Sequence, residues 1–264
     1  MGNTYGDWLR GQREAAGLTQ QQLADAAVMT RSHIAHIEAG RRIPSKEDAR
    51  RLDKALNTGN VLSSFRPGDD VAVADRFAVA LELEQQATVI REFAPALVPG
   101  LFQTEGYARA VMGAVFPPWS ETECDRLVRT RLDRAKILAE PVAPVVWAVL
   151  DEAVLRRPVG GPRVMAEQIS HIVRLVEEKR VRVHVLPISL GAHPLLSGLV
   201  KLMWFEDQPP AAWCEGVSVS KLHDSPDVVQ RLVQVYDLAL GDALPLKESL
   251  ALMRATAKEY GHHD

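Results

Sequence analysis

The sequence predicts a chain of the α+β or α/β class, in which a small all-helical domain precedes a larger domain of helices and about four strands. Three observations lead to this prediction. The 264 residues exceed the usual size of one domain. Apolar residues recur at helical spacing over residues 7–56, where no stretch alternates as a strand would. After Pro141, short segments rich in valine and aromatic residues begin.

The first domain, residues 1–57, contains two short helices whose ends are marked by polar residues and glycine. Thr19 can cap the first helix, and Gln22, three residues later, can complete a capping box. Thr30 can cap the second helix and Gly40 can end it. Apolar residues between these ends give each helix one buried side. Two such helices joined by a turn of three or four residues form a helix-turn-helix unit.

A linker is predicted at residues 58–74, because the sequence there gathers Asn, Gly, Ser, Pro and Asp and loses its apolar periodicity. The second domain then covers residues 75–264. Leu101 and Phe102 lie in a proline-broken loop and are expected to pack into this domain, and Thr104 is expected to cap the helix that follows. The first helices predicted in this domain are residues 74–93, 104–116 and 121–140.

The remainder of the second domain alternates between strand and helix patterns. Four strands are predicted, at residues 142–150, 181–187, 196–206 and 211–220. The helices predicted around them are residues 163–179, 225–240 and 244–260.

Candidate ligand-binding residues stand near the ends of these strands, where open α/β sheets bind ligands. They are Asp151, Glu152, His184 and His193. Carboxylates with histidines can serve acid–base chemistry. Glu152 also fits the first turn of a helix, where its charge favours the helix dipole. Because no catalytic motif or metal-ligand spacing accompanies them, neither an enzyme nor a cofactor is expected.

Composition and charge exclude several classes of protein. Hydrophobic residues make up 47% and charged residues 25% of the chain, as in an ordinary globular protein. The net charge of −3 divides into +2 over residues 1–58 and −5 over the rest. The positive excess in residues 1–58 is too small to indicate nucleic-acid binding from charge alone. Cys124 and Cys214 form no CxxC, and no segment has the pattern of a signal peptide or membrane span. We therefore expect a cytoplasmic protein without a membrane anchor.

The segments GLTQQQLA, TRSHIAHIEAG and RRIP, within residues 8–56, resemble the helix-turn-helix regulators of the xenobiotic-response-element class, which are related to phage repressors and Cro. The resemblance implies that the second helix enters the major groove of DNA. Val28 stands where that class usually has glycine, and its branched side chain tolerates a positive φ poorly, which favours a wider or differently wound turn. The predicted DNA-binding residues are Gln20, Arg31, Ser32, His33, His36, Arg41 and Arg42.

Arg31 is the strongest of these candidates. A cation in the first turn of a helix opposes the helix dipole, so contact with guanine or phosphate explains it better than local structure does. His33 is equally compatible with covering the groove between helices. Arg41 and Arg42 are equally compatible with a solvated helix end.

The second domain carries a resemblance of its own. FAPALVPGLFQTEGYARAVM, RLVRTRLDRAKIL, VLDEAVLRRPVGG, VHVLPISLGAHP and LVKLMWFED resemble the C-terminal domain of unknown function in many such regulators from high-GC filamentous bacteria, often accompanied by a small separate protein. We therefore expect a transcription regulator that binds double-stranded DNA as a homodimer and receives a small-molecule or protein signal. The alternatives are a DNA-tethered α/β enzyme and an antitoxin-like member of a two-protein pair.

Overall fold

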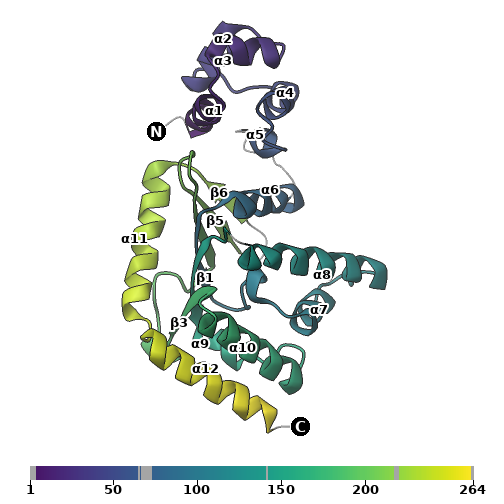
Figure 1. Cartoon of the computed structure of the whole chain (residues 1–264), viewed down its shortest axis with the longest axis vertical. Helices are drawn as coiled ribbons and strands as arrows, with labels where there is room; N and C mark the ends of the chain where they lie inside the picture. Colours follow the sequence, from purple (N-terminus) through teal and green to yellow (C-terminus); the bar gives the residue numbers. More distant parts are fainter. Residues whose placement is uncertain (1–3, 65, 67–72, 141, 217–219, 263–264) are drawn as a thin grey trace. The chain divides into compact units, whose positions relative to one another are not determined.

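The computed structural model describes residues 4–64, 66, 73–140, 142–216 and 220–262 (Figure 1). Its N-terminal part is helical, as predicted. The helices there are α1 (Thr4–Ala15), α2 (Gln20–Ala26), α3 (Arg31–Glu38), α4 (Lys46–Leu56) and α5 (Val61–Ser64).

Both predicted helix caps of the helix-turn-helix are confirmed. The Thr19 hydroxyl accepts a hydrogen bond from the Gln22 amide at 3.2 Å, and the Gln22 side chain accepts one from the Thr19 amide at 2.8 Å, which completes the capping box of α2. The Thr30 hydroxyl accepts from the His33 amide at 3.2 Å and caps α3. The helices enclose one apolar core, formed by Tyr5, Leu9, Leu23, Ala24, Ala27, Ile34, Ile37, Leu52 and Leu62.

The turn between α2 and α3 contains Val28, at the position where the resembled class usually has glycine. Val28 itself adopts the left-handed conformation, with φ of 56°, and its side chain is 78% exposed. The exposed position explains how a branched residue is tolerated, because no neighbour adds a clash to the backbone strain.

Part of the predicted linker forms α5, and the Asp53 carboxylate explains why a helix begins there. It accepts hydrogen bonds from the amides of Leu62 and Ser63, at 2.7 and 2.8 Å, and from the Thr58 hydroxyl at 2.7 Å. Leu62 is buried in the helical core. Residues 65 and 67–72 of the linker lie outside the described residues, and the predicted domain boundaries stay a prediction.

The second part of the chain combines helices with a mixed sheet, so the fold is α+β overall. Its helices are α6 (Val73–Gln86), α7 (Glu105–Gly113), α8 (Glu121–Ala135), α9 (Glu152–Arg156), α10 (Pro162–Glu177), α11 (Pro226–Asp242) and α12 (Leu246–Gly261). Its strands are β1 (Val89–Ala94), β2 (Val145–Asp151), β3 (Val181–Leu186), β4 (Leu199–Trp204), β5 (Ala211–Glu215) and β6 (Ser220–His223). Short 3₁₀ turns lie at Gly100–Phe102, Lys136–Ala139 and Ile188–Leu190.

The described sheet has six strands in the order β3-β2-β1-β4-β5-β6, where the sequence predicted about four. The prediction of a helix over residues 74–93 was wrong at its end: α6 stops at Gln86, and β1 follows. β2 and β3 pair in parallel, with Val146 opposite Val181, whereas β5 and β6 pair antiparallel, with Ala212 opposite His223. By its internal contacts the chain divides into two units, residues 1–89 with 201–233 and residues 90–200 with 234–264.

Hydrogen bonds hold two connecting segments of the second unit in place, the loop at Leu101–Phe102 and the link between α11 and α12. Leu101 and Phe102 are buried, as predicted, and the Gln168 side chain holds this loop by donating to the Phe102 carbonyl at 2.7 Å. The link between α11 and α12 runs along β3: the Leu244 amide donates to the Val185 carbonyl at 2.8 Å, and the Val185 amide donates to the Ser249 hydroxyl at 3.0 Å.

Candidate nucleic-acid interface

The helix α3 has one face in the core and one exposed face. Ile34, Ile37 and Glu38 are buried, whereas Arg31, Ser32 and His36 are exposed, and so are Arg41 and Arg42 just beyond the helix. In the described part of the chain, Arg31 and Arg41 form no hydrogen bond or ion pair through their side chains. Five of the seven predicted DNA-binding residues therefore lie on an accessible surface around α3.

The other two predicted residues, Gln20 and His33, are engaged inside the domain. The Gln20 amide group donates to Glu38 Oε2 at 2.8 Å. The His33 side chain is only 15% exposed, and its Nε2 lies 3.7 Å from Asp48 Oδ2. Gln20 remains half-buried, and for His33 the arrangement favours the alternative of covering the groove between α3 and α4.

The surroundings of His33 lower the pKa of its imidazole and so favour the neutral form. Burial lowers the pKa of His33 below its ordinary 6.5, and the nearby Arg42 guanidinium lowers it further, while the Asp48 carboxylate opposes them. The same carboxylate accepts a hydrogen bond from the Ser45 amide at 3.2 Å, as part of the capping box that begins α4.

A buried ion pair that the sequence analysis did not single out connects α1 to α3. Glu38 is 1% exposed, and its Oε1 accepts from Arg13 Nε at 2.6 Å. The hydrogen bond to Glu38 raises the pKa of Arg13. Arg10 Nη2 donates to the Glu38 carbonyl at 3.2 Å. The signal in the sequence was the spacing: Glu38 follows Ile34 by four residues and so lies on the buried face of the helix.

The predicted ligand-binding residues come together in part, at a site that we call the β2–α9 corner: Asp151, Glu152 and His193. Asp151 ends β2 and caps α9, because its Oδ1 accepts from the Ala153 amide at 2.7 Å. Its Oδ2 lies 3.4 Å from His193 Nε2. The His193 side chain is 3% exposed and packs edge-to-face against Phe93, and its Nδ1 has no hydrogen-bond partner in the described structure.

Glu152 holds the segment after β3 against the corner. Its Oε2 accepts from the Ile188 amide at 3.1 Å, and its Oε1 lies 3.2 Å from Arg156 Nη2. The alternative that Glu152 occupies the first turn of a helix is confirmed by α9. His184 lies apart from the corner, with its Nδ1 3.0 Å from the Leu244 carbonyl oxygen.

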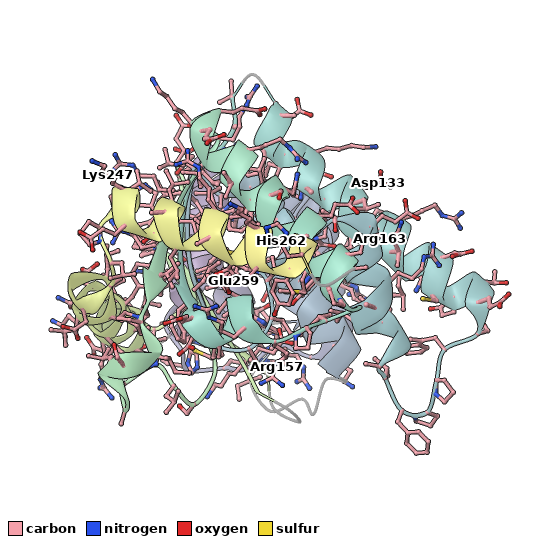
Figure 2. All side chains as sticks on the ribbon, turned by 90° about the horizontal axis from the view of Figure 1, so that it is seen from below. Asp133, Arg157, Arg163, Lys247, Glu259 and His262 are labelled. Carbon is pink, nitrogen blue, oxygen red and sulfur yellow. The ribbon has the colours of Figure 1, made fainter. Side chains whose placement is uncertain are left out.

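The C-terminal turn of α12 is tied to α9. Glu259 is labelled in Figure 2, and its Oε2 lies 2.8 Å from Arg156 Nη1. The Tyr260 hydroxyl donates to the Arg156 carbonyl at 2.8 Å. Arg156 thus joins the corner to the end of the described chain. Among the described residues, no three His, Cys, Asp or Glu side chains gather to hold a metal ion, and no helix is long and apolar enough to cross a membrane.

Comparison with known proteins identifies two regions. Residues 77–255 match a family model described as a domain of unknown function (DUF5753), and residues 4–63 match a helix-turn-helix domain. No curated protein and no solved structure matches the chain.

Proposed function

The chain belongs to the DUF5753 family, and we propose that it is a sequence-specific transcription regulator of the xenobiotic-response-element class that reads DNA through α3. The helix-turn-helix domain indicates DNA binding. In this motif the N-terminal residues of the second helix meet base edges in the major groove, while the first helix crosses the backbone. The helix α3 presents Arg31, Ser32 and His36 for that purpose.

Arg31 is the observation that carries the proposal. It occupies the first position of α3, where its charge opposes the helix dipole at a cost of about 0.3–1 kcal/mol. The described residues supply no carboxylate within ion-pair distance of it. A guanine presents two acceptors, O6 and N7, that match a guanidinium in bidentate geometry. In this proposal DNA supplies the partner that Arg31 does not find among the described residues.

The test begins with selection of bound sequences from random duplex DNA by the full chain. On the selected site, Arg31→Ala should lose about 1–3 kcal/mol of binding free energy and relax the base preference at one position. Arg126→Ala is the control, because it also removes one exposed positive charge, from an arginine paired with Glu123 in α8. The proposal fails if no sequence is enriched, or if Arg31→Ala behaves as Arg126→Ala does.

We also propose that the second domain receives a signal, without catalysis, from a small molecule or a small partner protein. The β2–α9 corner supports this proposal, because Asp151 Oδ2 and His193 Nε2 lie 3.4 Å apart there, and His193 Nδ1 is buried without a partner among the described residues. A hydroxyl or amide N–H of a ligand could donate to that nitrogen. His184 remains a predicted member of the site that lies outside the corner.

Thermodynamic linkage makes the receiver proposal testable. A ligand that changes operator affinity must have its own affinity changed by operator DNA by the same factor, typically about 5–150-fold. The first probe is the protein encoded beside this gene, titrated into the full chain by calorimetry with and without operator. Binding that leaves operator affinity unchanged would refute the receiver role for that partner. Turnover of a substrate that Glu152→Gln abolishes would instead favour the enzyme alternative.

A further inference from the structure

Ala35 lies within the exposed face of α3, among the side chains proposed to read bases. Residues four apart lie above one another on a helix, so Arg31 and Ala35 share one line, and Ser32 and His36 share the next. Ala35 is half-buried, while its neighbours Ile34 and Ile37 face the core. A single methyl group therefore stands between three longer polar side chains.

We propose that Ala35 determines specificity by placing its methyl group against the 5-methyl group of a thymine, an inference that rests on the proposed DNA-binding function. A methyl side chain can neither donate nor accept a hydrogen bond, so it cannot satisfy the polar edge of a base. In the major groove the thymine methyl is the apolar group that distinguishes one base from another. Any other base facing Ala35 would lose water from a polar edge without gaining a partner.

The position of this thymine in the operator follows from helix geometry. Ala35 follows Arg31 by four residues, which is a rise of about 6 Å along the helix. Base pairs are stacked about 3.4 Å apart. The thymine should therefore lie within about two base pairs of the base whose recognition Arg31→Ala abolishes.

Deoxyuridine provides the test, because it lacks only the 5-methyl group of thymidine. On the site selected by the full chain, each thymidine in turn is replaced by deoxyuridine and the affinity is measured. One replacement, within two base pairs of the position assigned to Arg31, should weaken binding about fourfold, the effect of one buried methyl group. In Ala35→Gly the same replacement should have no effect. Ala15→Gly is the control at an exposed alanine of α1 and should keep the fourfold loss.

Ala35→Ser gives a second readout that does not depend on the stability of a glycine variant. A hydroxyl can pair with several bases, so a repeated selection with Ala35→Ser should lose the thymine preference at that position alone. The inference is overturned if the selected site has no thymine there, or if deoxyuridine weakens wild type and Ala35→Gly equally. If the full chain enriches no sequence at all, both the proposed DNA-binding function and the inference about Ala35 fail.

Discussion

Val28 carries backbone strain in the turn that orients α3. A left-handed conformation costs a residue with a side chain about 1–2 kcal/mol, and glycine avoids this cost while losing more entropy on folding. Val28→Gly should therefore raise the free energy of unfolding by about 0.5–1 kcal/mol, measured by denaturant unfolding. Val115→Gly is the control, since Val115 is also an exposed valine outside the helices and strands but has no positive φ. A Val28→Gly protein no more stable than wild type would show that the turn is unstrained.

His33 should make stability depend on pH. Because burial lowers its pKa in the folded chain, the unfolded chain takes up a proton first as the pH falls through the ordinary value of 6.5. The free energy of unfolding should therefore fall with pH below about 6.5. His33→Gln should flatten this slope in denaturant unfolding followed from pH 7.5 to 5.5. Between pH 7.5 and 8.5 the imidazole is neutral in both the folded and the unfolded chain, so the free energy of unfolding should change with pH equally in the variant and in wild type. An equal dependence on pH in the two proteins below pH 6.5 would contradict the prediction.

At the scale of elements, the ion pair between Arg13 and Glu38 fixes α1 against α3. Breaking a buried pair from one side leaves a buried charge and costs up to about 3–5 kcal/mol, whereas replacing both partners by apolar residues costs far less. Arg10 Nε, 3.8 Å from Glu38 Oε2, compensates part of the charge that remains when Arg13 is removed. Arg13→Met should therefore destabilise the chain strongly, and Arg13→Met with Glu38→Leu should cost much less than the two single changes together. A double-mutant cycle by denaturant unfolding measures the difference.

The matched control for this cycle is an exposed pair in the same domain. Arg51 and Glu47, four residues apart on α4, are 3.3 Å apart and both exposed, so Arg51→Met should cost no more than about 0.5 kcal/mol. Additive losses at Arg13 and Glu38 would mean that the two side chains stabilise α1 and α3 independently.

Local patterns predicted the caps of α2 and α3 but not β1. A cap is a contact between residues three apart, so Thr19 with Gln22 could be recognised from the sequence. The apolar spacing of α6 continues through Ile90, and neither glycine nor proline marks the end of the helix. What favours a strand there is pairing with a distant segment, as in the hydrogen bond from the Thr88 amide to the Trp204 carbonyl. A pattern read along the chain does not contain that information.

The candidate DNA-binding residues could also be predicted only in part, because some of their contacts are with residues distant in the sequence. The exposure of Arg31 and Ser32 follows from the periodicity of α3. The engagement of Gln20 depends on Glu38, 18 residues away, and that of His33 depends on Asp48 in another helix. Such partners become known only when the helices are packed together.

At the scale of the whole molecule, the size of α3 bears on assembly. Its eight residues can read only a few base pairs. Proteins with this motif gain specificity by placing two such helices about 34–36 Å apart, one turn of DNA. We expect a homodimer, so sedimentation of the full chain with its selected site should give two chains per duplex, and the site should contain an inverted repeat. A single chain per duplex on a site without symmetry would contradict this expectation.

The segment around the α11–α12 connection contacts the outer edge of β3, the first strand in the order of the sheet. The Leu244 amide of the connection and the Ser249 hydroxyl of α12 occupy the carbonyl and the amide of Val185 on that edge, where an unpaired strand would otherwise template the addition of a strand from another molecule. A premature stop codon just before Leu244 would uncover that edge while leaving the helix-turn-helix intact. The truncated protein should therefore aggregate. It should not persist as a shorter protein that still binds the operator and competes with the full chain.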